Sequence, residues 1–242
     1  TASLAEHTEL VAVAERTGRR CQVGFQTFGS RALPAAADLV ARGEIGEVRG
    51  VGAVGTWVRT AAYWGRAPWA GRRRLDGRDV VDGVVTNPLA HAVATALRVG
   101  GATRAEDVAS VEADLFRANP IEADDTSSVR VVGTDGTRYG FGLTLCAPER
   151  SPARVLVLGT RGELVLEYEH DRLLLRTDRL TVDKTYDRAP LLDDLLAARQ
   201  DPDRPLLCDV RDTGAFMRVM EAVRTGPDPA PVAGPAVEWR GE

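Results

Sequence analysis

The stretch DGVVTNPLAH, residues 82–91, is the most informative part of this 242-residue chain. Asn87 is a favourable N-cap residue and Pro88 suits the first helical position, so the stretch predicts a helix that begins at Asn87. His91 follows Asn87 by four residues, which places both side chains on one face of that helix. A polar cap and a titratable ring close to Gly83 are typical of the wall of an active site.

The composition, with 44% apolar and 27% charged residues, is typical of a soluble globular protein of one large domain or two smaller ones. A formal net charge of −4 gives no indication of a nucleic-acid surface. Three widely spaced cysteines are typical of reduced thiols. The sequence has no apolar run as long as a membrane span and no visible signal peptide. We therefore expect a cytoplasmic protein without nucleic-acid or membrane partners.

Hydrophobic periodicity divides the chain into two parts. Residues 3–18 combine a capping box with helical spacing, and 21–26 predict a short buried strand. Together they form half of an α/β unit, whose partner strand we expect upstream of Thr1. Beyond them the pattern predicts helices over 34–41, 87–99, 191–199 and 210–224, the last capped by Asp209, and an extended Pro-rich end over 227–235. Period-two strands, expected to form a meander of antiparallel strands in one open sheet, are predicted over 47–58, 108–116, 129–132, 139–145, 154–158, 163–168 and 172–176.

This order of elements resembles the Gfo/Idh/MocA family of nicotinamide-dependent oxidoreductases. Residues 23–26 are similar to the last strand of that family's dinucleotide-binding domain, and 41–48 to the entry into its second domain. Residues 83–91 resemble its glycine-rich approach to an Asp-x-x-x-His motif. The resemblance implies an α+β fold with a large open, mainly antiparallel sheet and flanking helices, preceded by a Rossmann remnant of one helix and one strand. It assigns 1–26 to that remnant and 27–242 to a substrate and oligomerisation domain.

Two features depart from the family pattern. No Gly-x-Gly-x-x-Gly opens a helix after a strand, and the family's Glu-Lys-Pro motif would precede Thr1. We therefore expect this chain to be inactive without the rest of the Rossmann domain. The other departure is Asn87, where the family usually has Asp. An amide neither takes nor gives a proton at neutral pH, although it can orient a hydroxyl, so His91 remains as the main titratable group.

The resemblance implies reversible hydride transfer between NAD or NADP and the carbinol carbon of a sugar, cyclitol or polyol. An imidazole titrates near pH ~6.5, so His91 can take the hydroxyl proton while Asn87 positions the substrate. Gln26, at the end of the predicted strand, would face the nicotinamide. Aromatic rings stack on sugars and arginine binds anions, so the expected pocket residues are Tyr63, Trp64, Arg66 and Trp69. Each of these residues also has a structural alternative: a helix cap for Asn87, a strand end for Gln26, and a core or subunit-interface position for the aromatic residues. For Trp57 we expect the core or interface position.

The remaining polar residues predict no chemistry. His7 and His170 are expected at the surface, Asp124-Asp125 in a solvated turn and the arginine run 72–74 on a solvated face, while Lys184, the single lysine, has no expected role. Distant histidines without a cysteine pair do not indicate a metal site.

An uncovered sheet with an apolar face needs a cover, so we expect a homo-oligomer formed through that face, as in the family. The alternative function is a non-catalytic carbohydrate-binding or scaffold domain, which Asn87 and the missing motifs favour. The intact stretch 83–91 favours an enzyme.

Overall fold

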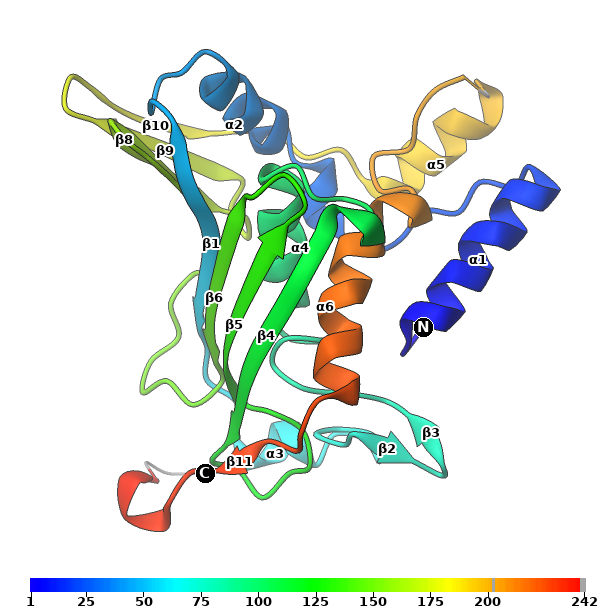
Figure 1. The fold of residues 1–242 in the computed structure, drawn as a ribbon, viewed down its shortest axis with the longest axis vertical. Helices are drawn as coiled ribbons and strands as arrows, with labels where there is room; N and C mark the ends of the chain where they lie inside the picture. The colour runs from blue at the N-terminus through cyan, green and yellow to red at the C-terminus, as the bar shows by residue number, and fades with distance from the viewer. Residues whose placement is uncertain (202, 240–242) are drawn as a thin grey trace.

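The computed structural model describes residues 1–201 and 203–239, and its centre is a nine-stranded sheet (Figure 1). The strand order is β10-β9-β8-β7-β1-β6-β5-β4-β11. The strands are β1 (Val48–Thr56), β4 (Val108–Arg117), β5 (Thr126–Gly133), β6 (Arg138–Thr144), β7 (Arg154–Gly159), β8 (Gly162–Glu167), β9 (Arg172–Thr177), β10 (Thr181–Thr185) and β11 (Ala230–Pro231). A separate hairpin pairs β2 (Arg74–Leu75) with β3 (Arg78–Asp79).

The sheet is mixed rather than a simple meander. β1 lies between β6 and β7, parallel to β6 and antiparallel to β7, so it divides the predicted series of hairpins. β11 is parallel to β4, and apart from these two parallel pairs every described pair in this sheet is antiparallel. The predicted class, an α+β fold with a large open and mainly antiparallel sheet, is confirmed.

Helices cover one face of this sheet. α4 (Ala90–Val99) contacts β1, β6 and β7, and α6 (Gly214–Thr225) contacts β4; Figure 1 shows α6 beside β4. The other helical segments are α1 (Leu4–Thr17), α2 (Ala32–Ala41), α3 (Ala61–Trp64), α5 (Leu191–Gln200) and the 3₁₀ turns Gln26–Gly29, Ala105–Asp107, Val210–Thr213 and Gly234–Ala236.

Alternation along the strands defines the two faces. In β5, Val129 and Val131 are buried toward the helices, whereas Arg130 and Val132 are exposed on the other side. This period of two is what a strand requires when one face packs and the other does not. The core therefore lies between the sheet and the helices α4 and α6.

Glycines in β1 allow close packing on both sides of that strand. A Cβ at Gly55 would lie 2.5 Å from Cδ1 of Leu89, the residue that precedes α4, and a Cβ at Gly52 would overlap the carbonyl oxygen of Gly140 on β6. These glycines have the spacing Gly-x-Gly-x-x-Gly with Gly50. Because all three lie inside a strand, the spacing here serves sheet packing and forms no phosphate-binding turn.

The N-terminal part is simpler than predicted. Ser3 caps α1 by accepting a hydrogen bond from the Glu6 amide (3.2 Å), and Gly18 ends the helix with φ +63°. The predicted strand over 21–26 is reduced to one β-bridge, between Gln22 and Asp209. No parallel neighbour lies beside this segment among the described residues, so nothing extends the bridge into a ladder.

Candidate functional site

The turn before α4 is built differently from a capped helix start. α4 begins at Ala90 with Leu89 as its N-cap, so the predicted cap at Asn87 is wrong. The backbone amide of Asn87 donates to the Gly83 carbonyl (3.0 Å), and the backbone carbonyl of Asn87 accepts from the Ala90 amide (3.1 Å). The side chain of Asn87 is therefore free of capping and donates through Nδ2 to Oδ1 of Asp82.

Asp124 holds this turn from beneath. Its carbonyl accepts from the Val84 amide (2.9 Å), and its carboxylate accepts from the Val85 amide (3.4 Å) and the Ser127 hydroxyl (2.7 Å). A Cβ at Gly83 would overlap its Oδ1, so only glycine fits at that position. Burial raises the pKa of Asp124.

The expectation of a solvated turn at Asp124 and Asp125 is wrong, because both side chains are buried. Asp125 accepts from the amides of Ala118 and Asn119 (2.9 and 2.7 Å), which satisfies its carboxylate inside the protein. Backbone N–H groups thus hold Asp125 in the core, whereas Oδ1 of the adjacent Asp124 is buried without a hydrogen-bond partner.

Asp82 is the polar centre of the site. Only 3% of the residue is exposed, and its Oδ2 accepts from the Gly71 amide (2.8 Å) and from Nη2 of Arg66 (3.2 Å). Its Oδ1 accepts from Asn87. Asp82 therefore joins the turn before α4 to the aromatic segment, although the sequence analysis assigned it no role.

The aromatic segment, residues 57–69, forms a layered stack of cations and rings. The Arg66 guanidinium lies 3.6 Å from the Tyr63 ring centroid and 4.7 Å from that of Trp69. Arg59 also lies over the Tyr63 ring, 4.7 Å from its centroid, and Trp64 meets Tyr63 edge to face (5.0 Å). The structure thus brings Tyr63, Trp64, Arg66 and Trp69 together, and it connects them to Asn87 through Asp82.

Trp57 and Trp64 extend the stack inward. Trp57 is buried and lies under the guanidinium of Arg59, at 4.9 Å, which agrees with its expected structural role. The indole nitrogens of both tryptophans are buried without a hydrogen-bond partner. Trp64 also lines a cavity of about 540 Å³, together with Gly71, Pro120 and Ile121.

His91 lies in the first turn of α4 and is half-buried. Its ring meets Phe25 edge to face, with centroids 5.3 Å apart. Burial, and secondarily the charge of Arg188, lower the pKa of His91 below its usual value. The ring is therefore neutral at pH 7 and can accept a proton.

Gln26 is exposed, but it does not end a strand as predicted. It begins the 3₁₀ turn Gln26–Gly29, because the amides of Phe28 and Ser30 donate to the carbonyls of Phe25 and Thr27 (2.9 and 3.0 Å). Its neighbour Phe25 touches His91, so Gln26 lies one residue from a contact of the imidazole.

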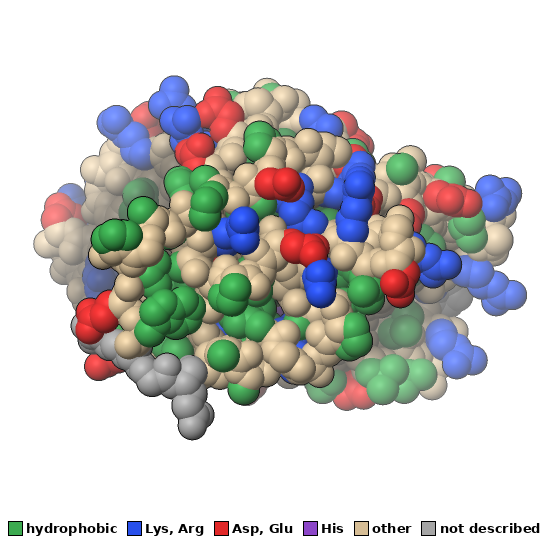
Figure 2. Space-filling model, turned by 90° about the horizontal axis from the view of Figure 1, so that it is seen from below, with side chains coloured by type: hydrophobic (Ala, Val, Ile, Leu, Met, Phe, Trp, Pro, Cys, Tyr) green, Lys and Arg blue, Asp and Glu red, His purple; other side chains and the backbone are tan. Residues whose placement is uncertain are grey.

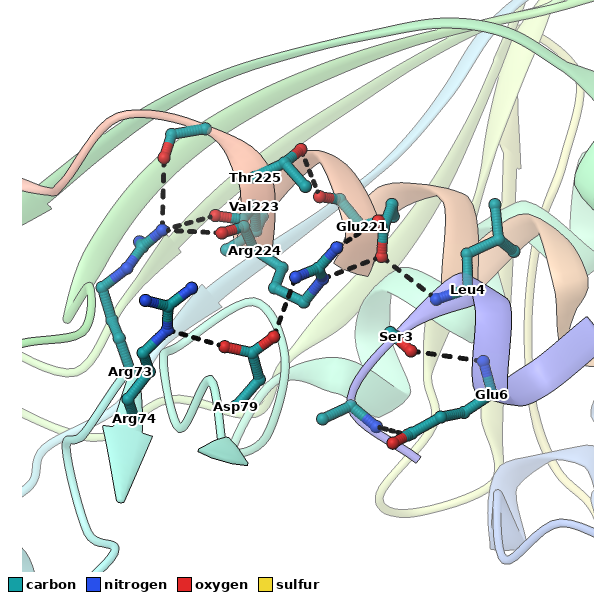
Figure 3. A network of polar contacts seen from close by, with 12 residues as sticks. Ser3, Leu4, Glu6, Arg73, Arg74, Asp79, Glu221, Val223, Arg224 and Thr225 are labelled. Carbon is teal, nitrogen blue, oxygen red and sulfur yellow. Dashed lines mark hydrogen bonds and ion pairs between the residues drawn. The ribbon is translucent and has the colours of Figure 1, made fainter. Parts of the chain in front are cut away.

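Arg72 and Arg74 are exposed, as expected of a solvated face, whereas Arg73 between them is half-buried. Nη2 of Arg73 donates to three carbonyls at the C-terminus of α6, those of residues 223, 224 and 226 (3.1–3.2 Å), and Asp79 pairs with Arg74 and Arg224 (2.9 and 2.8 Å; Figure 3). Figure 2, which views the end of the molecule with β2, β3 and β11, shows basic and acidic side chains close together. A cavity of about 640 Å³ lies here, and none of the predicted site residues lines it.

The other histidines differ from each other. His7 is buried, and its Nε2 lies 2.8 Å from the Val210 carbonyl and 3.2 Å from the Thr213 hydroxyl, so its expected surface position is wrong. Its helix packs against α6 and the turn before it, which the sequence pattern of α1 does not reveal. His170 is exposed, as expected, and Lys184 is exposed as well.

The described residues contain no group of three or more His, Cys, Asp and Glu side chains suited to a metal ion, and Cys21, Cys146 and Cys208 are free. Within the same residues, no helix is long and apolar enough to cross a membrane.

The family model of the GFO/IDH/MocA C-terminal domain matches residues 34–165, which contain β1, α4 and the whole of the site except Gln26. The chain belongs to the GFO/IDH/MocA family. Among curated proteins, no sequence matches it.

Solved structures share the fold at low sequence identity. The WlbA dehydrogenase from Bordetella pertussis, in complex with NADH and UDP-GlcNAcA, has a TM-score of 0.69 at 19% identity. The aldose-aldose oxidoreductase from Caulobacter crescentus, complexed with glycerol, has 0.72 at 17%, and an inositol dehydrogenase homolog from Azotobacter vinelandii, complexed with NADH and myo-inositol, has 0.69 at 14%. Each match covers 92% of this chain and 66% of the solved chain.

Proposed function

We propose that this chain is the substrate-binding part of an NAD(P)-dependent oxidoreductase that acts on a sugar, cyclitol or polyol. Family membership supports the reaction class, and the sugar-type ligands and NADH of the similar structures support the substrate and cofactor classes. The observation that carries the proposal is the polar turn itself: Asn87 is exposed, held by Asp82 beside a stack of aromatic rings, one helical turn from a neutral His91. In this proposal residues 1–26 are the end of a dinucleotide-binding domain and 27–242 are the substrate and oligomerisation domain.

His91 acts as the general base in the direction of oxidation. The carbinol O–H proton passes to the imidazole while the carbinol hydrogen leaves as hydride, so the alcohol becomes a carbonyl. The nicotinamide, when bound, accepts that hydride. A lowered pKa suits this role, because the ring must start unprotonated.

The other residues bind and orient. Asn87 accepts a hydrogen bond from a substrate hydroxyl, and Gln26 contacts the nicotinamide or the substrate. Tyr63, Trp64, Arg66 and Trp69 line the pocket, where rings pack on the apolar face of a sugar. The residues present fit the substrate end alone, because the Gly-x-Gly-x-x-Gly spacing lies inside β1, so we derive no binding mode for the phosphates of the dinucleotide.

A second candidate function is carbohydrate binding without redox chemistry. Asn87 favours it, since an amide exchanges no proton at neutral pH. In that case the same rings and amide would bind a polyol that is never oxidised.

Substitution of His91 tests the choice between the two. We measure reduced-nicotinamide formation with a panel of polyols, and polyol binding by calorimetry, in a full-length form that includes a dinucleotide-binding domain, for the wild type, His91→Ala and the matched control His170→Ala. The dehydrogenase proposal expects a loss of turnover of about 10²–10⁴-fold in His91→Ala and none in the control. Unchanged turnover in His91→Ala overturns the catalytic assignment. Polyol binding without turnover in the wild type supports the second candidate.

A further inference from the structure

The buried carboxylate of Asp82 receives three hydrogen bonds, two from residues 66–71 and one from the turn before α4. Oδ2 accepts from the Gly71 amide and from Arg66, and Oδ1 accepts from Nδ2 of Asn87. Asp82 is buried, whereas Asn87 is exposed. The carboxylate therefore acts on the exposed side chain from behind.

The chemistry of a carboxylate fixes which way the Asn87 amide faces. An ionised carboxylate accepts hydrogen bonds and donates none, so the NH2 group of Asn87 must face it. The carbonyl oxygen Oδ1 of Asn87 then lies on the other side of the Cβ–Cγ bond, away from Asp82, and it has no partner among the described residues. The Arg66 guanidinium, 3.2 Å from Oδ2, forms an ion pair with Asp82.

We propose that Asp82 is a positioning residue, which holds Asn87 so that its carbonyl oxygen faces the substrate and accepts a hydrogen bond from a hydroxyl. The proposal rests on the proposed function, and it gives Asn87 a defined polarity within it. Asn87 then serves as an acceptor that carries no charge and exchanges no proton. The selected ligand is a hydroxyl donor, a polyol carbinol rather than a carboxylate or a phosphate.

The same hydrogen bonds also connect the aromatic segment to the acceptor. Arg66 lies against the rings of Tyr63 and Trp69 and donates to Asp82. A ligand that moves these rings therefore acts on the group that orients Asn87. Ring stacking and hydroxyl recognition are joined through one carboxylate.

The isosteric variant Asp82→Asn separates orientation from shape. Its single carbonyl oxygen must stay with Gly71 and Arg66, because two donors meet there. The new NH2 group then faces Asn87, and two NH2 groups in contact repel each other. Asn87 must rotate its amide and present its NH2 group, in place of its oxygen, to the substrate.

The first readout is the side-chain amide of Asn87 in ¹⁵N-labelled protein, assigned with Asn87→Ala. We expect its two N–H resonances to shift in Asp82→Asn and to stay in place in Asp79→Asn, the matched control, whose carboxylate pairs with arginines instead. Unshifted Asn87 resonances in Asp82→Asn overturn the inference. This readout does not depend on any enzymatic activity.

The second readout is polyol affinity, measured by calorimetry with myo-inositol and glycerol as probes. We expect about tenfold weaker binding in Asp82→Asn, the loss of about one hydrogen bond, at about 1.4 kcal/mol. The double variant Asp82→Asn/Asn87→Asp restores an outward acceptor, since the amide introduced at position 82 can donate to a carboxylate at position 87, and we expect it to recover the affinity. Equal polyol affinities in all variants overturn the inference. If the Asn87 side-chain resonances shift in Asp82→Asn but the protein binds no polyol, the inference holds and the proposed function is overturned.

Discussion

The two faces of the sheet are made by the same strands and have opposite characters. On the covered face, side chains such as Val129 and Phe141 are buried in the hydrophobic core that also contains residues of α4 and α6. On the open face, Val132 and Leu158 are 38% and 45% exposed, among glycines and polar residues. Alternation therefore predicts which side chains share a face. Whether helices cover that face decides how much each of its side chains contributes to stability.

The largest expected effect comes from a matched pair of phenylalanines on opposite faces. Phe141 on β6 is 3% exposed and Phe116 on β4 is 39% exposed. We expect Phe141→Ala to lower the free energy of unfolding by about 3–5 kcal/mol, because it removes buried surface and leaves a cavity. Phe116→Ala should change it by about 0.5 kcal/mol or less. Urea unfolding checks both, and equal losses would contradict the assignment of the faces.

A pair of glycines opposite each other in register tests the sheet itself. Gly52 on β1 pairs with Gly140 on β6, and a Cβ at Gly52 would overlap the Gly140 carbonyl, whereas a Cβ at Gly140 meets nothing within 4 Å. We expect Gly52→Ala to cost about 1–3 kcal/mol of unfolding free energy through overpacking. Gly140→Ala should be neutral within about 0.5 kcal/mol. If Gly140→Ala is the more costly change in thermal unfolding, the packing described around β1 is wrong.

The sequence predicts β4 to β7, which have one packed and one open face, and it also predicts β8 and β9, in which three successive apolar side chains are buried. It misses β10, whose five side chains are all exposed and show no alternation. It also misses the position of β1 between β6 and β7, because pairing between distant segments leaves no local pattern.

The sequence predicts which residue types form the site, but it does not predict the hydrogen bonds that link them. Tyr63, Arg66 and Asn87 stand out because aromatic, guanidinium and amide groups are common ligands for sugars. Asp82 is missed, although an acid five residues before Asn87 can reach its side chain when the chain turns. Asp124 is misplaced because sequence alone does not show that the Val85 amide and the Ser127 hydroxyl meet its carboxylate inside the protein.

His91 lies where the covered face ends, and it gives a smaller, pH-dependent effect. Its pKa is lowered in the folded protein, so between that value and the usual value near ~6.5 the unfolded chain binds more protons. Stability is therefore fully present above pH ~6.5 and falls as the pH drops through the folded pKa, by at most about 1.4 kcal/mol per pH unit. His91→Gln should flatten this slope in unfolding measured from pH 8 to 5, on the order of the range where histidine titrates. An unchanged slope would place the ring outside the packed region, and His170→Gln is the control.

The smallest effect on folding is expected on the open face, where the proposed oligomer forms. Leu158 on β7 and Leu196 on α5 are 45% and 46% exposed, so an arginine at either position should change the unfolding free energy of the monomer by about 0.5 kcal/mol or less. Their effects on association should differ, because an interface across the sheet would bury Leu158 and a buried unpaired charge is costly there. We expect sedimentation equilibrium to show dissociation in Leu158→Arg and wild-type assembly in Leu196→Arg. A monomeric wild type, or equal assembly in both variants, would mean that another copy of the chain does not cover the open face.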